Sequence, residues 1–244
     1  MSQHIASIYD RDLEGVQARI MKMGGLVEQA IQDSSKALET RDEELAEKVR
    51  QSDIAIDELE EMIHEETARI IALRAPTAGD LRVVLSIMKI SSNLERIGDY
   101  AKNMAKRTSV LLQMTQITGA HSALRRMARE VESMLQDSLD AFIQRDPVLA
   151  QDVINRDRDV DQMYNALFRE FLTFMMEDPR NITACMHLHF MAKNTERMGD
   201  HVTSIAEQVI YLVTGDTPDE ERLKGDKTSV DPSIAPPAPS HGGK

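Results

Sequence analysis

Tryptophan is absent from this chain of 244 residues, and the other aromatic residues number only five Phe and four Tyr. Hydrophobic residues nevertheless make up 41% of the sequence, and fifteen of them are Met. Strands favour aromatic and β-branched side chains, whereas this composition favours helices. The sequence therefore predicts an all-α protein, and its length allows a core to form without disulfides or structural metals.

Cysteine and basic charge are also scarce. The single cysteine, Cys185, cannot form an internal disulfide, and we expect it to be a small buried hydrophobic residue. The N-terminus lacks the basic and apolar order of a secretory signal, which favours a cytoplasmic protein. The 29 basic and 41 acidic residues leave a net charge of −12, so the chain would repel a phosphate backbone, and no nucleic-acid partner is expected.

No apolar run is long enough to cross a membrane. The densest one, from Leu81 to Ile90, contains Arg82 and Lys89 and is shorter than the ~20 residues that span a bilayer. Any membrane role is therefore expected to be peripheral and to depend on a partner.

Proline is rare before residue 215, and its positions there mark turns. Pro76, Pro147 and Pro179 stand alone, as expected at helix ends or in first helical turns. The other five prolines fall in the segment 215–244, together with Gly, Ser and Asp and without apolar periodicity. This composition predicts a flexible tail.

Apolar residues before the tail recur at spacings of three and four. The spacing predicts long helices over about 13–38, 42–75 and 80–116. Three long amphipathic helices with short connections predict an antiparallel three-helix bundle.

The second half of the chain repeats the first. The segment 93–99, Asn-Leu-Glu-Arg-Ile-Gly-Asp, recurs 101 residues later as Asn-Thr-Glu-Arg-Met-Gly-Asp, and the pair Asp53 and Asp57 recurs after 104 residues as Asp157 and Asp161. The change in offset falls near the proline turns, where a deletion is best tolerated. The sequence therefore predicts two tandem, pseudo-symmetric antiparallel three-helix bundles, over residues 5–116 and 117–214.

Two acid-x-x-x-acid pairs recur in both copies. Residues four apart share one face of a helix, where two carboxylates repel each other unless a cation is present. In the first copy the pairs lie about 21 residues before and after Pro76, which places them at one height in an antiparallel hairpin. We therefore predict sites for hard cations, namely iron, Mg, Mn or Zn. The candidate ligands are Asp53, Asp57, Glu95 and Asp99 in the first copy and Asp157, Asp161, Glu196 and Asp200 in the second.

Other residues extend or qualify this prediction. Counting across the turn at 41–42 brings Glu28 and Asp33 to a similar level, and the repeat does the same with Glu132 and Asp137 in the second copy. The alternative is a solvated acidic face, with Arg96 and Arg197 neutralising their neighbours. Gly98 and Gly199 disfavour a helix, so their repetition indicates either close helix contact or room for an ion.

Glu61 and His64 form a Glu-x-x-His pair, the helical signature of ferritin-like di-iron bundles. The aligned residues of the second copy are Asn165 and Phe168, so we interpret this pair as surface.

The turn from Leu73 to Arg82 and the doubled Glu-Arg-hydrophobic-Gly-Asp motif resemble the PhoU family of regulators of bacterial high-affinity phosphate uptake, over about residues 5 to 214. The resemblance implies two symmetric three-helix bundles, a homodimer, and multinuclear metal sites on the eight carboxylates. It also implies two partners: the ATPase subunit of a phosphate ABC transporter and a membrane sensor histidine kinase, whose signalling such proteins suppress when phosphate is plentiful.

The sequence contains no Walker-type phosphate loop and no nucleophile constellation. We therefore expect a non-enzymatic regulator of phosphate uptake and of phosphate-starvation signalling. Two alternatives stay open: a carboxylate-bridged di-metal oxidoreductase, which needs nitrogen ligands that the repeat does not supply, and a structural helical scaffold without metal.

Overall fold

The computed structural model describes residues 2–217, and within them six α-helices and one short 3-10 helix follow one another with no strand. In chain order the elements are α1 (Ser2–Thr40), α2 (Glu43–Arg74), α3 (Ala78–Leu111), α4 (Ala120–Gln144), α5 (Pro147–Glu177), η1 (Pro179–Asn181) and α6 (Ile182–Thr214). The all-α prediction is confirmed. The predicted tail lies outside the described residues from position 218 onward.

The repeated Arg-Asp pair forms the same turn in both copies. Arg41 and Arg145 both adopt left-handed backbone conformations, with φ of 57° and 56°. Each is followed by an aspartate that caps the next helix: the Asp42 carboxylate accepts from the backbone N–H of Leu45, and that of Asp146 accepts from Leu149. The recurrence of these residues is therefore explained by local helix capping.

The turn between α2 and α3 is shorter than the sequence indicated. Only residues 75–77 lie outside a helix, and Asp80 to Arg82 already belong to the first turns of α3. At its other end α3 stops at Leu111, five residues before the predicted end at Gln116. The N–H groups of Gln113 and Met114 donate to carbonyls three residues back, which tightens the chain and ends the α-helical pattern.

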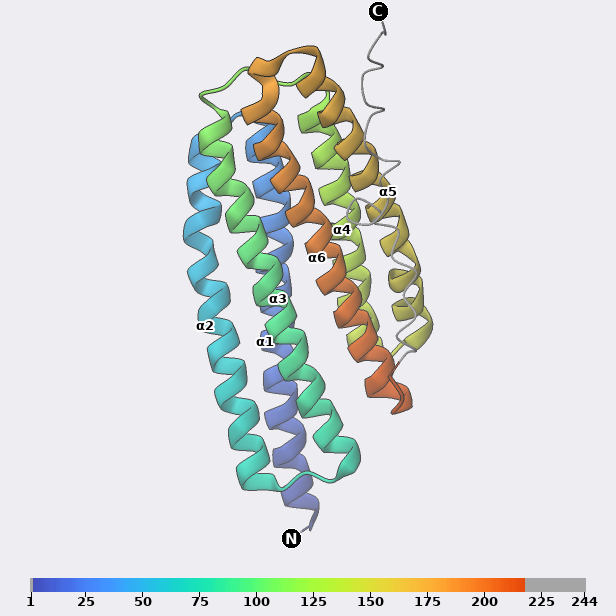
Figure 1. Cartoon of the computed structure of the whole chain (residues 1–244). Helices are drawn as coiled ribbons and strands as arrows, with labels where there is room; N and C mark the ends of the chain where they lie inside the picture. The colour runs from blue at the N-terminus through green and yellow to red at the C-terminus, as the bar shows by residue number, and fades with distance from the viewer. Residues whose placement is uncertain (1, 218–244) are drawn as a thin grey trace, which may run out of the picture.

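Helices α1, α2 and α3 pack as one three-helix bundle, and α4, α5 and α6 as another (Figure 1). The bundles lie side by side because α1 packs against α4 and α3 against α6. The α2–α3 turn and the α5–η1–α6 turn lie at opposite ends of the molecule (Figure 1). Each contact between the copies thus joins a helix to its own counterpart, which is a pseudo-two-fold arrangement.

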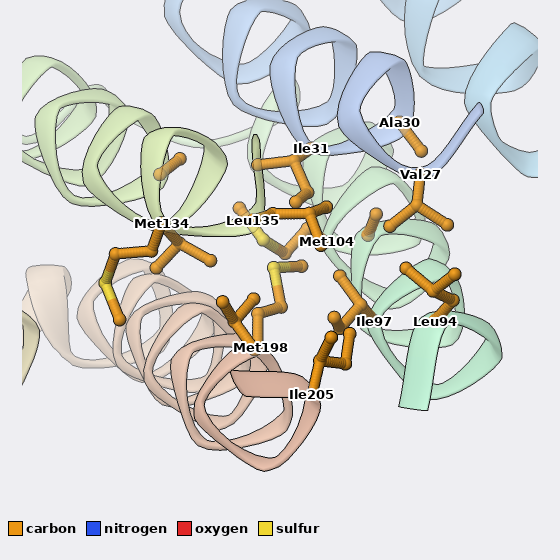
Figure 2. Packing of buried hydrophobic residues seen from close by; sticks show 14 of the residues in the cluster. Val27, Ala30, Ile31, Leu94, Ile97, Met104, Met134, Leu135, Met198 and Ile205 are labelled. Carbon is orange, nitrogen blue, oxygen red and sulfur yellow. The ribbon is translucent and has the colours of Figure 1, made fainter. Parts of the chain in front are cut away.

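A core shared by both copies fills the space between these four helices. Figure 2 shows Val27 and Ile31 from α1 near Met104 from α3, with Leu135 of α4 and Met198 of α6 in the same group. All five are at most 1% exposed. Methionine is flexible enough to fill the irregular gaps between crossing helices. The bundles are therefore held together by apolar burial, at about 25 cal/mol for each Å² removed from water.

Two predictions about apolar residues are tested by the fold. Cys185 is fully buried on α6, as predicted, and burial raises the pKa of its thiol. Over residues 2–217, none of the helices combines the length and apolarity required for a membrane span.

Candidate functional site

Helices α2 and α3 bring the four candidate ligands of the first copy together. The pKa of Glu95 is raised from its ordinary 4.5 to about 7, first by burial and then by the charges of Asp99, Glu60 and Asp57, against the opposing effect of Arg96. The pKa of Asp57 is also raised, by burial and then by the charges of neighbours that include Asp53 and Asp99. The two acidic pairs therefore share one cluster, as the matched register predicted.

A lysine lies inside this cluster. The ammonium of Lys102 forms a short ion pair with Asp53 Oδ2 and lies 3.6 Å from Asp99 Oδ1. Its hydrogen bond to Asp53 is the main cause that raises its pKa. Asp53 is only 3% exposed, and its second oxygen, Oδ1, is buried without a hydrogen-bond partner. The cluster thus carries its own counter-ion and still leaves one buried carboxylate oxygen unsatisfied.

Glu60 is a fifth carboxylate of the cluster. It lies seven residues after Asp53, on the same face of α2, and accepts a 2.8 Å hydrogen bond from the hydroxyl of Ser92 on α3. His64 Nε2 lies 3.8 Å from Glu60 Oε1. The sequence had paired His64 with Glu61, which is exposed. The acid that lies near His64 is therefore Glu60, four residues before it, and not Glu61.

The two repeated glycines allow close helix contact. A Cβ at Gly98 would lie 3.0 Å from Ile56 Cδ1, and one at Gly199 would lie 3.2 Å from Asp157 Oδ1 and 3.4 Å from Val160 Cγ1. These positions therefore set how closely α2 approaches α3 and α5 approaches α6. Each glycine lies inside an acid-x-x-x-acid motif, so this close contact occurs at the level of the acidic pairs.

In the second copy, Asp157 of α5 lies against Gly199, between Glu196 and Asp200 of α6, and this group of acids, here called the second cluster, has a different lysine beside it. Asp161 and Glu196 are 5% and 4% exposed, and Lys193 Nζ lies 2.9 Å from Glu196 Oε1. The repeat places Ser92 at the position of Lys193, and it places Thr203 at the position of Lys102. Both copies thus supply a lysine to their carboxylates, but from different positions on the third helix.

The acids of α1 and α4 have other neighbours. Glu28 of α1 accepts a 3.2 Å hydrogen bond from Gln136 of α4, and its charge, after burial, raises the pKa of Glu132 on the same helix. Asp33 lies 3.8 Å from Lys48, and Asp137 forms an ion pair with Arg156. The carboxylates that raise the pKa of Glu95 all come from α2 and α3. Similar height along the bundle therefore did not bring Glu28 or Asp33 beside Glu95.

The acidic cluster of the first copy has the oxygen donors that a hard cation prefers, but its side chains are not close enough together to coordinate one. Within the part of the chain that the structure describes, no three Asp, Glu, His or Cys side chains converge closely enough to hold a metal ion. The donors in the first copy are carboxylate oxygens, and Lys102 lies among them. The unsatisfied oxygen of Asp53 fits a cation that takes the place of that ammonium.

The raised pKa of Glu95 predicts that stability depends on pH. Because this pKa is about 7 in the folded chain and 4.5 ordinarily, the folded state binds the extra proton and stability falls as pH rises between these values. In chelator, Glu95→Gln should raise the free energy of unfolding at pH 8 by about 1 kcal/mol after allowance for solvent screening, with little change at pH 4. Urea unfolding at both pH values checks this, with the exposed Glu65→Gln as control; an equal effect at both would contradict it.

Comparison with known proteins identifies a matching family. The PhoU domain matches residues 20–108 and 124–209. A "phosphate-specific transport system accessory protein PhoU homolog" of Rhizobium meliloti (strain 1021) is 44% identical over 235 residues, which cover 93% of this chain and 96% of that protein. The homolog of Zymomonas mobilis is 47% identical over 87% of this chain and 89% of its own length.

Two solved structures share the fold. The crystal structure of PhoU from Pseudomonas aeruginosa matches with a TM-score of 0.83 and 41% sequence identity. The match covers 85% of this chain and 100% of that chain. The phosphate transport system regulatory protein PhoU from Streptococcus pneumoniae has a TM-score of 0.80 at 32% identity, over 86% of this chain and 99% of that chain.

Proposed function

The chain belongs to the PhoU family, and from that premise we propose that it is a non-enzymatic, cytoplasmic regulator of phosphate uptake and of phosphate-starvation signalling. Its output is protein contact, made as a homodimer with the ATPase subunit of a phosphate ABC transporter and with a membrane sensor histidine kinase. The observation that carries this proposal is the doubled PhoU domain in a chain whose relatives are named accessory proteins of phosphate-specific transport.

The acidic clusters are the proposed cation sites of this regulator. Asp53, Asp57, Glu95 and Asp99 would hold a hard cation in the first copy, and Asp157, Asp161, Glu196 and Asp200 would do so in the second. The buried, unpaired oxygen of Asp53 supports the first site. When bound, Mg²⁺, Mn²⁺, Zn²⁺ or iron would supply positive charge that joins the second and third helices of each copy. An oxidoreductase is not favoured, because Tyr164 and Phe168 occupy the positions of Glu60 and His64 in the second copy.

Deletion of the gene tests the regulatory function. We expect the deletion strain to express its phosphate-starvation genes in phosphate-rich medium, and we expect the tagged wild-type chain to restore repression and to co-purify with the transporter ATPase or the kinase. Reporter activity and affinity purification measure these outcomes. Normal repression in the deletion strain would overturn the proposal.

Elemental analysis tests the cation sites separately. Glu95→Ala with Asp99→Ala should lower the metal content of protein purified without chelator, because two of the four candidate ligands of the first copy are lost. The matched control is Glu61→Ala with Glu65→Ala, another acidic pair four residues apart on one helix, in which both side chains are exposed. Unchanged metal content in the first double variant would refute the site assignment.

A further inference from the structure

The line along which α3 packs against α6, here called the α3–α6 seam, is made of two rows of side chains. Each row advances in steps of three or four residues. The row on α3 consists of Arg82, Leu85, Lys89, Asn93, Arg96, Tyr100, Asn103, Arg107 and Val110, and the row on α6 consists of Thr183, Met186, Phe190, Asn194, Arg197, His201, Ser204, Gln208 and Tyr211. Contacts join α3 and α6 at several heights. His201 Nδ1 lies 2.8 Å from Asn93 Oδ1, Arg107 lies 3.3 Å from His187 Nδ1 toward one end, and Arg82 lies 5.6 Å from the ring centroid of Tyr211 toward the other. At ~1.5 Å per residue the seam is roughly 42 Å long.

The seam has the opposite charge to the rest of the chain. The chain carries 41 acidic residues, yet neither row contains an Asp or a Glu. The rows instead hold five basic residues: Arg82, Lys89, Arg96, Arg107 and Arg197. A basic line on a protein with a net charge of −12 attracts a partner of negative charge and fixes its orientation.

Each end of the seam combines a cation with exposed apolar side chains. At the end near the start of α6, the Arg107 guanidinium lies 4.4 Å from the ring centroid of Phe190, which is 43% exposed. Met186 and Val110 beside it are each 39% exposed. This mixture of aromatic, Met and Arg side chains is typical of the centres of protein interfaces.

The other end of the seam has the same combination, with cations on α3 beside an aromatic ring on α6. Arg82 lies 5.6 Å and Lys89 lies 5.9 Å from the ring centroid of Tyr211. Leu85, between the two cations on α3, is 42% exposed. Two anchoring points of similar chemistry therefore lie at the two ends of one line.

The cations at these ends keep their charge available. Among the residues that the structure describes, Arg82, Lys89 and Arg107 take part in none of the ion pairs. Basic residues on other faces, such as Arg19 and Arg74, form ion pairs with acids of neighbouring helices. Aromatic rings hold the three cations at the ends of the seam in place without neutralising them.

We propose that the α3–α6 seam docks an acidic, amphipathic helical segment of a partner protein. The carboxylates of the segment pair with Arg82, Lys89 and Arg107, and its apolar residues cover Leu85 at one end and Phe190 at the other. The distance from Arg82 to Arg107 corresponds to a helix of about 25 residues. This inference rests on the proposed function, in which the output is protein contact.

The acidic residues on both sides of the seam restrict the partner to a narrow one. Glu95 and Asp99 lie beside the seam on α3, and Glu196 and Asp200 lie beside it on α6. A broad anionic surface, such as a membrane or a nucleic-acid duplex, would meet these carboxylates and be repelled. One helix with a single acidic face can follow the basic line without meeting them.

A designed peptide tests the seam directly. The probe is a fluorescent 25-residue helix of Glu, Leu and Ala with one acidic and one apolar face, about the length derived above, compared with its Gln-for-Glu analogue. We expect the acidic peptide to bind the wild-type chain, to bind more weakly as salt rises, and to lose about tenfold or more in affinity on the double variant Arg82→Glu with Lys89→Glu. Phe190→Ala should weaken binding without changing the salt dependence.

The control exchanges the same number of charges elsewhere. Lys22→Glu with Arg158→Glu changes two exposed basic residues on α1 and α5 and should leave peptide affinity within about twofold of the wild type. Thermal unfolding of each variant confirms that it folds.

Several outcomes would overturn the proposal: failure of the acidic peptide to bind, equal binding by the seam and control variants, or a changed oligomeric state of the seam variants, which would assign the seam to a second copy of the chain. Tighter binding to phosphatidylglycerol vesicles than to the peptide would assign it to a membrane instead. None of these results depends on gene repression, so failure of the seam and failure of the regulatory function are distinguishable.

Discussion

Lys102→Met is expected to destabilise the chain in chelator and to strengthen cation binding at the first cluster. The substitution leaves Asp53, which is 3% exposed, without its counter-ion. Breaking a buried ion pair from one side costs about 3 kcal/mol in unfolding free energy. With Mg²⁺ or Mn²⁺ added, the variant should recover much of this loss, because the cation no longer competes with an ammonium group. Its affinity for the cation should exceed that of the wild type by about tenfold or more, measured by titration calorimetry and by the shift in Tm.

Two controls separate charge from packing. Lys102→Arg keeps the positive charge and should bind the cation as weakly as the wild type does. Lys193→Met removes the lysine of the second cluster and should strengthen binding there while leaving the first cluster unchanged. If Lys102→Met lowers stability but metal affinity stays the same in all three variants, Lys102 does not occupy a cation site.

Gly199→Leu is the second substitution with a large expected effect. A Cβ at this position already lies 3.2 Å from Asp157 Oδ1 and 3.4 Å from Val160 Cγ1, so a leucine must push α5 away from α6. We expect a loss of about 3 kcal/mol or more in unfolding free energy from overpacking and from disturbance of the buried carboxylates. Metal content should fall with it, because the height and spacing of the second cluster depend on this contact.

Gly25→Leu provides the matched comparison. Gly25 is an exposed residue within α1, and nothing lies within 4 Å of a Cβ built there. Leucine favours a helix more than glycine does, so this variant should gain about 0.5 kcal/mol in stability. Urea unfolding of the two variants compares them, and equal effects would show that the α5–α6 contact does not depend on the glycine.

The fold could be predicted because its determinants are local or repeated. The Arg41-Asp42 pair recurs as Arg145-Asp146, and in both places the structure shows a left-handed residue followed by a helix cap. The register of the acidic pairs in the first copy follows from counting residues on either side of Pro76. Neither inference needs knowledge of which side chains meet across helices.

The features that the sequence missed are those that break the repeat. Lys102 was overlooked because its counterpart is Thr203, and Glu60 because its counterpart is Tyr164. Counting residues along a helix gives the height of a side chain but not the direction in which it points. Height alone therefore suggested that Glu28 lies near the acidic pairs. In the structure its side chain accepts a hydrogen bond from Gln136 on α4, across the contact between the copies. The rotation of α1 about its axis is decided by the shared apolar core, which is a property of all four helices around it.

The packing of α1 on α4 and of α3 on α6 has an evolutionary consequence. A shorter ancestor with three helices would have buried the same surfaces in a dimer of identical subunits, and joining two such genes through the connection at 112–119 would preserve that assembly in one polypeptide. While the subunits were encoded once, every mutation arose in both. After fusion, Lys102 could diverge from Thr203 and Lys89 from Phe190, so that a single gene gained the asymmetry of a heterodimer.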